Sequence, residues 1–137
     1  MKPVDEPRAL WRYTLEDGWS VAVGRSDHAN EQLSLEWADR NDYWLHVKGL
    51  PGSHVVLHNE QEPGSSAPGA VLRHAASIAA WHSKARNAGR VPVHVTRAAH
   101  VSKPRGAKRG TVSIRNETTI KTRPAQPLVD NTGKSPL

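Results

Sequence analysis

The chain has 137 residues, no cysteine and a formal net charge of +6. This length suits one domain with a single core, and the lack of thiols excludes a disulfide framework, thiolate catalysis and zinc sites built on cysteine. No run approaches the ~18 apolar residues that a membrane-spanning helix needs, and the N-terminus lacks the apolar core of a signal peptide. We therefore expect a cytoplasmic protein without a membrane segment.

Charge is distributed unevenly along the sequence. Residues 1–62 carry 6 Lys/Arg and 11 Asp/Glu, a net of −5, whereas residues 63–137 carry 13 Lys/Arg and 2 Asp/Glu, a net of +11. If both halves share one core, the fold should present a basic side, as proteins that bind polyanions do. Phosphate is then the expected counter-charge, although basic tails and loops can also serve solubility alone.

The first half of the chain predicts two hairpins with a short helix between them. Alternating apolar residues on either side of Asp17-Gly18 indicate the first hairpin, because this dipeptide is a strong turn signal. Ser26 or Asp27 could cap the helix, whose apolar face holds Leu33 and Trp37. The expected elements are strands 11–15 and 19–24, a helix over 28–39 and a hairpin over 42–58.

The second half predicts the main helix, further strands and a basic loop. The stretch 70–88 contains no Gly or Pro, and its small residues fall on one helical stripe that ends before Gly89. Pro92 has no backbone N–H to donate to a neighbouring strand. We therefore expect that its strand lies at a sheet edge or that Pro92 lies at the start of the strand. After a loop at 60–69, the expected elements are a helix 70–88, a strand 91–96, a basic loop 103–110, a hairpin of 111–115 with 118–122, and a disordered tail 125–137. We expect an α+β fold, a mostly antiparallel sheet packed with one long helix and a short helix.

The first arm of the 42–58 hairpin carries an unusual polar face. Alternate side chains of a strand share a face. One face would hold Asp42, Trp44, His46 and Lys48, and the other Tyr43, Leu45 and Val47. The first set could bind RNA, with rings that stack on bases beside a cation. It could also bury Trp44 in a core and leave the other three side chains in water.

The turn 49–52 leaves the register of this hairpin open. A four-residue loop would pair Lys48 with Ser53 and put His46 and His54 on opposite faces. A three-residue loop over 49–51 would put His46 opposite His54 on the same face.

Metal and serine chemistry are not favoured by these residues. Asp42, His46, His54 and His58 offer metal-ligating atoms, but His54 and His58 would lie roughly 13 Å apart along one strand at ~3.3 Å per residue, too far for one ion without a bend. The adjacent Ser53 and His54 would point to opposite faces and could not form a nucleophile and base pair. We expect no metal, no cofactor and no enzymatic activity.

Two groups of cations are candidate phosphate ligands. Lys84 and Arg86 lie near the expected end of the helix 70–88, where cations also interact favourably with the helix dipole. The loop 103–110 interleaves cations with small or rigid residues that allow a phosphate chain to approach closely. Its cations are Lys103, Arg105, Lys108 and Arg109. A solvated helix end and a flexible basic loop are the alternative interpretations.

Several motifs in this order resemble the NFACT-R domain, the RNA-binding domain at the C-terminal end of the NFACT proteins of ribosome quality control, which also occurs as small standalone bacterial proteins. The resemblance is to the standalone type and covers roughly 11–124. The matching positions are Asp17-Gly18, Val23-Gly24-Arg25, Asn30, Asp42, Trp44, His46, Gly52-Ser53-His54, Ala75-Ala76, Ala79, Ser83, Lys103-Pro104, Gly106-Ala107-Lys108 and Gly110. We therefore expect an N-terminal extension at 1–10, an NFACT-R-like domain at 11–124 and a tail at 125–137.

The resemblance implies a non-enzymatic RNA-binding module linked to ribosome- or tRNA-containing complexes, with tRNA or ribosomal RNA as partner. A small RNA-processing enzyme and a protein adaptor docking on a translation-machinery surface are the alternatives. Alanine tailing of nascent chains is not expected, because it belongs to the full architecture of the family. The candidate RNA-binding residues are Trp44, His46, Lys48, Ser53, His54, Lys84, Arg86, Lys103, Arg105, Lys108 and Arg109.

Overall fold

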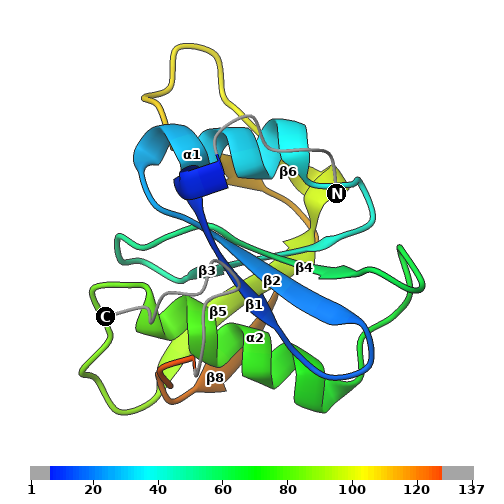
Figure 1. Cartoon of the computed structure of the whole chain (residues 1–137). Helices are drawn as coiled ribbons and strands as arrows, with labels where there is room; N and C mark the ends of the chain where they lie inside the picture. Colours follow the sequence, from blue (N-terminus) through cyan, green and yellow to red (C-terminus); the bar gives the residue numbers. More distant parts are fainter. Residues whose placement is uncertain (1–6, 128–137) are drawn as a thin grey trace.

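A computed structural model describes residues 7–127 as one six-stranded sheet with a helical segment on each face (Figure 1). The strand order is β1-β2-β4-β3-β5-β8, and every neighbouring pair is antiparallel. The strands are β1 Leu10–Thr14, β2 Trp19–Gly24, β3 Tyr43–Val47, β4 Val55–Asn59, β5 Val91–Arg97 and β8 Thr118–Thr122. A separate ribbon pairs β6 Val101–Ser102 with β7 Ser113–Ile114. The α+β prediction with a mostly antiparallel sheet is confirmed.

The two helical segments are close in length. α2, Gly69–Trp81, has 13 residues, whereas α1, Asp27–Gln32, has 6 and runs directly into the 5-residue π-helical turn η2, Leu33–Trp37. The oxygen of the Ser26 side chain caps α1 by accepting a hydrogen bond from the Ala29 amide at 3.0 Å. The predicted contrast between one long and one short helix is therefore not evident. Two short 3-10 turns, η1 Pro7–Ala9 and η3 Ala98–His100, complete the described structure.

Alternation along the strands divides the apolar core into two layers. On one face of the sheet, Leu45 and Leu57 pack in a cluster with the buried alanines of α2, so the predicted alanine stripe is the packing face of that helix. On the other face, Trp44 and Val56 pack with Leu33 and other residues of α1 and η2. The expected division of β3 into two faces is confirmed.

The 42–58 hairpin adopts the register that puts His46 and His54 on one face. Trp44 is the Cα partner of Val56, and Leu45 of Val55. Extended by one residue, this register places His46 opposite His54, and the ring centroids of the two histidines are 5.5 Å apart. The ladder stops before the turn, however, so the connection is longer than three residues.

α2 ends at Trp81 and does not continue to residue 88 as predicted. The chain instead pairs with the loop that precedes β4. The Ser53 amide donates to the His82 carbonyl at 2.9 Å, and the Lys84 amide donates to the Pro51 carbonyl at 3.1 Å. These long-range bonds pair backbone N–H and C=O groups after Trp81 that would otherwise bond within a longer helix. They also join the end of α2 to the turn of the β3–β4 hairpin.

The predicted hairpin of 111–115 with 118–122 is wrong. β7 pairs back with β6, while β8 pairs with β5. Asn116, with φ of 55°, lies between β7 and β8. The basic loop 103–110 therefore connects β6 with β7, and β5 is an inner strand. Pro92 lies near its start, where the Pro92 carbonyl accepts a hydrogen bond from the Lys48 amide at 2.9 Å.

Residues 1–6 of the expected N-terminal extension and residues 128–137 of the expected tail lie outside the described residues. At the near end of the tail, the Ala125 amide donates to the Ser77 carbonyl at 3.2 Å. Within residues 7–127, no helix combines the length and the apolar character needed to cross a membrane.

Candidate nucleic-acid interface

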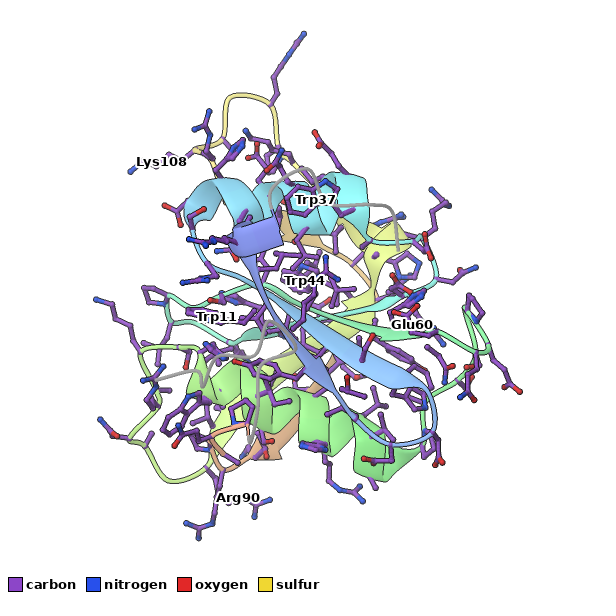
Figure 2. All side chains as sticks on the ribbon, viewed as in Figure 1. Trp11, Trp37, Trp44, Glu60, Arg90 and Lys108 are labelled. Carbon is purple, nitrogen blue, oxygen red and sulfur yellow. The ribbon has the colours of Figure 1, made fainter. Side chains whose placement is uncertain are left out.

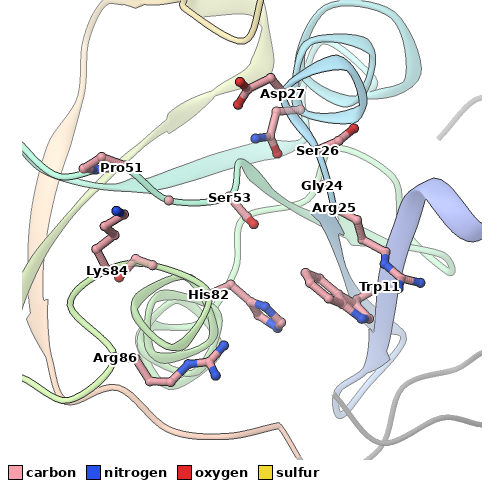
Figure 3. A pocket seen from close by; sticks show the side chains of 13 residues that line it. Trp11, Gly24, Arg25, Ser26, Asp27, Pro51, Ser53, His82, Lys84 and Arg86 are labelled. Atoms are coloured by element: carbon pink, nitrogen blue, oxygen red, sulfur yellow. The ribbon is translucent and has the colours of Figure 1, made fainter. Parts of the chain in front are cut away.

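β1, the β2–α1 junction, the loop 51–53 and the end of α2 surround a groove of about 360 Å³ (Figure 3). We call it the cationic groove. Its lining includes Trp11, Arg25, Ser53, His82, Lys84 and Arg86. The pairing of the loop 51–53 with the end of α2 thus brings together three residues predicted to bind RNA, one from the hairpin and two from beyond the helix.

An aromatic stack supports one wall of this groove. Trp11 stacks on His82, with ring centroids 4.5 Å apart and planes 28° apart. His82 is buried and is held by Tyr13, whose hydroxyl oxygen lies 2.8 Å from Nε2 of His82. The guanidinium of Arg25 lies 4.8 Å from the centroid of a Trp11 ring. A half-buried indole and an exposed cation are therefore presented together.

The two cations beyond α2 differ in how firmly they are held. The guanidinium of Arg86 lies 4.3 Å from the centroid of a Trp81 ring, and its Nε donates to the Trp81 carbonyl at 2.7 Å. Lys84 is exposed. One charge is fixed in position while the other can follow a ligand.

The basic loop is fastened to α1 by one carboxylate. Oε1 of Glu31 lies 2.8 Å from Nζ of Lys103 and accepts a hydrogen bond from the Gly110 amide at 3.1 Å. The hydrogen bond from Lys103 is the main cause of a lowered pKa of the Glu31 carboxyl. Lys103 is thus part of an ion pair, whereas Arg105, Lys108 and Arg109 project from the loop as exposed cations.

A second hollow, of about 330 Å³, lies between the sheet and the chain that enters β7. We call it the histidine pocket. It is lined by Trp44, His46, His54, His94, Gly110, Thr111, Val112 and Ile114. A third hollow, of about 280 Å³, shares His46 and His54 with this pocket and Pro51 and Gly52 with the cationic groove, and it is also lined by Lys108 and Arg109. Because neighbouring hollows share lining residues, we name the three together the depression.

His54 is held in the neutral form chiefly by burial and also by the nearby His46. The Trp44 indole N–H donates to Oγ of Ser34 at 2.8 Å, and Oγ lies 2.7 Å from Nδ1 of His54. The indole can only donate, so the Ser34 oxygen is its acceptor and the Ser34 hydroxyl proton is free to be donated to Nδ1 of His54. Burial lowers the pKa of His54 to about 4, and it also lowers the pKa of His46.

The sequence model of the family described as NFACT protein RNA binding domain matches residues 9–116. The chain belongs to this family. The match includes every candidate RNA-binding residue, so the expected resemblance is confirmed.

Relatives of known sequence and structure agree with this assignment. The chain is 40% identical over 111 residues to the Rqc2 homolog RqcH of Bacillus subtilis (strain 168), and 34% identical over 116 residues to that of Streptococcus suis (strain 05ZYH33). These alignments cover 81% and 84% of the chain but only 19% and 20% of the relatives, so the chain spans about a fifth of their length. A solved structure of the C-terminal part of the fibronectin/fibrinogen-binding protein from Streptococcus suis matches with a TM-score of 0.78 and 32% identity, over 91% of this chain and 49% of that chain.

The three residues of β3 and its turn that were predicted to bind RNA, Trp44, His46 and Lys48, differ in how exposed they are. Trp44 is only 2% exposed, so its ring faces cannot stack on an RNA base in this conformation. His46 is half-buried and reaches two of the hollows. Lys48 is exposed in the turn after β3 and does not line the depression.

Trp11, Arg25 and His94 belong to the depression but were not predicted as site residues. The partners that define their positions, such as His82 for Trp11, are distant in the sequence. A signal existed only for Arg25, which lies in the family motif Val23-Gly24-Arg25.

The residues considered for metal binding and for a serine nucleophile lie in separate places in the structure. His58 pairs with Asp42, with 2.6 Å between Nδ1 and Oδ1, and Oδ2 of Asp42 accepts a hydrogen bond from the Asp39 amide at 2.9 Å. Asp39, Asp42 and His58 offer ligand atoms within 4.8 Å of one another, a different set from the one considered in the sequence. Ser53 lines the cationic groove, whereas His54 bonds with Ser34.

Gly24→Ala should destabilise the domain by about 1–3 kcal/mol, the usual cost of overpacking a core. A Cβ at this position would overlap Oδ1 of Asn30 and lie 3.0 Å from the Asn30 Cα. That oxygen also accepts a hydrogen bond from the His54 amide at 3.0 Å, so any shift of Asn30 weakens the support of the depression. Urea unfolding measures the change. Gly89→Ala is the matched control, because its Cβ would meet nothing within 4 Å, and an equal loss in both variants would contradict the steric explanation.

Proposed function

We propose that this domain binds RNA along the depression, without catalysing a reaction on it, as part of ribosome- or tRNA-containing complexes. The observation that carries the proposal is the placement of cations in two hollows that share the lining residues Pro51 and Gly52. Arg25, Lys84 and Arg86 line the cationic groove, and Lys108 and Arg109 line the hollow that continues from it. Contacts of this kind with phosphates supply most of the sequence-independent affinity of proteins for nucleic acids.

Membership of the NFACT RNA-binding family and the similarity to RqcH support a link to ribosome quality control. The lack of a nucleophile and base pair at Ser53 and His54 supports a binding role in preference to a small RNA-processing enzyme. The adaptor alternative differs in its ligand, because docking on a protein surface does not require RNA phosphates.

A salt titration tests the proposal. The logarithm of affinity for single-stranded RNA should fall with the logarithm of salt concentration, by about 0.7 for each phosphate neutralised. Replacing Lys84, Lys108 and Arg109 together by Ala should weaken binding and flatten this slope by about 2. All three side chains are exposed, so their removal should leave the fold intact. Fluorescence anisotropy over a series of salt concentrations gives the slopes.

The control removes the same number of charges elsewhere. Arg90, Lys121 and Arg123 are exposed and do not line the depression. Figure 2 shows Arg90 and Lys108 at opposite ends of the molecule. The triple Ala variant at these positions should keep the wild-type slope. Equal flattening in both variants would mean that net charge, and not the depression, drives binding, and cleavage of the recovered RNA would favour the enzyme alternative.

A further inference from the structure

The histidine pocket differs in chemistry from the rest of the depression. Four of its lining residues are rings, from Trp44, His46, His54 and His94, and Val112 and Ile114 add apolar contact. Within the pocket lining there is no Lys, Arg, Asp or Glu, whereas Lys108 and Arg109 line the adjoining hollow. Charge is therefore concentrated at the rim of the pocket.

Three of these rings pack against one another and form one wall of the pocket. Trp44 and His46 are near parallel, at 20° with centroids 5.9 Å apart, while His54 stands edge-on to both, at 74° to Trp44 and 87° to His46. Burial keeps His46 and His54 neutral near pH 7, because it lowers the pKa of both. Neutral rings favour a planar, uncharged ligand group over a phosphate.

One polar atom of the pocket wall lacks a partner. Nδ1 of His94 is buried and makes no hydrogen bond within residues 7–127. A 180° flip of an imidazole exchanges Nδ1 with Cδ2 at nearly the same ring outline. In the flipped ring, Nδ1 takes the position of Cδ2, where a ligand would have to supply the partner that residues 7–127 do not. His94 lies directly opposite His46 in the β3–β5 ladder.

We propose that the histidine pocket takes one unpaired nucleobase of an RNA strand whose phosphates lie on Lys108, Arg109 and the cationic groove. This inference rests on the proposed RNA-binding function and specifies its substrate as single-stranded or looped RNA. The volume of about 330 Å³ lies near the lower end of the range for small-molecule sites, about 300–1,000 Å³, and suits one ring system. Unpaired bases are commonly recognised by stacking on aromatic side chains and by hydrogen bonds to their edges, which a base inside a duplex cannot offer.

The test compares an unstructured RNA of about 12 nucleotides, within the site sizes of single-strand binders, with a blunt duplex of the same sequence and with free AMP. Wild-type protein should bind the unpaired RNA most tightly and AMP most weakly, because the single phosphate of AMP cannot contact the cations of both the pocket rim and the cationic groove. His94→Ala should lower the affinity for unpaired RNA at least about fivefold, the smaller end of the loss of one base stack, and leave duplex binding unchanged. His74→Ala, at an exposed position on α2, is the control and should behave as wild type.

Crosslinking of wild-type protein provides a readout that does not depend on the fold of a variant. RNA that contains 4-thiouridine should crosslink within residues 91–97 or 107–114, mapped by mass spectrometry. The base-pocket proposal is overturned if His94→Ala folds and keeps the wild-type preference for unpaired RNA, if crosslinks avoid both segments, or if AMP binds as tightly as the RNA strand. Failure of the wild-type protein to bind either RNA would instead overturn the proposed function itself.

Discussion

Trp44→Ala should lower the free energy of unfolding by about 3–5 kcal/mol, the usual cost of removing a large buried aromatic side chain. Trp44 is 2% exposed and packs in the cluster between the sheet and the segment formed by α1 and η2. Its removal also takes away the N–H donor to Ser34, the residue that fixes His54. Urea unfolding followed by circular dichroism measures the loss.

Trp44→Phe separates the two contributions. Phe retains most of the apolar packing and removes the hydrogen bond to Ser34, which keeps its bond to His54, so the cost should be about 1 kcal/mol, the usual contribution of one hydrogen bond. A folded Trp44→Ala variant with unchanged stability and weakened RNA binding would contradict the core role and favour the predicted stacking platform.

The stability of the domain should fall by about 3 kcal/mol between pH 6.5 and pH 4 through His54 alone. The pKa of His54 is lowered from 6.5 to about 4, chiefly by burial. Between these values the unfolded chain binds a proton that the folded chain does not, so the free energy of unfolding decreases as pH falls. The loss is absent above pH 6.5 and complete below pH 4, and each pKa unit corresponds to about 1.36 kcal/mol. His46, whose pKa is also lowered, acts in the same direction.

His54→Asn isolates this effect, because Asn does not titrate and can still accept a hydrogen bond from Ser34. Unfolding measured from pH 7 to pH 4 should show a shallower decline for His54→Asn than for wild type. His28→Asn, at an exposed position, should reproduce the wild-type decline. Parallel curves for wild type and His54→Asn would mean that His54 accepts a proton in the folded state as readily as in the unfolded chain.

Local patterns in the sequence predicted five of the six strands of the main sheet as strands in their hairpins or alone, and the division of the faces of β3. The alternation from Asp42 to Lys48 separated Trp44 from Leu45, and the structure places these residues in different core clusters. The turn signal Asp17-Gly18 gave the first hairpin, in which both residues have positive φ. Such features depend on neighbours within a few residues, so a single sequence contains the information.

The incorrect predictions concern pairings between distant segments. The end of α2 depends on hydrogen bonds of Ser53 and Lys84 that join the loop 51–53 to the chain after the helix. Nothing in the sequence near residue 81 predicts these bonds. The partner of β7 is β6, on the far side of the basic loop, and the nearer β8 pairs elsewhere. The same limit applies to the site, because Trp11 enters the depression through its contact with His82.

β8 sets the shortest C-terminal boundary at which the domain keeps its complete sheet. The family match ends at residue 116, before β8, yet β8 pairs with β5 from Val91↔Thr122 to Val95↔Thr118. A truncation at residue 116 would leave the backbone groups on that side of β5 without partners and expose a strand rich in valine. Unpaired strand edges of this kind favour edge-to-edge aggregation. Expression boundaries for binding studies should therefore extend beyond Thr122, even though the sequence signature of the family stops earlier.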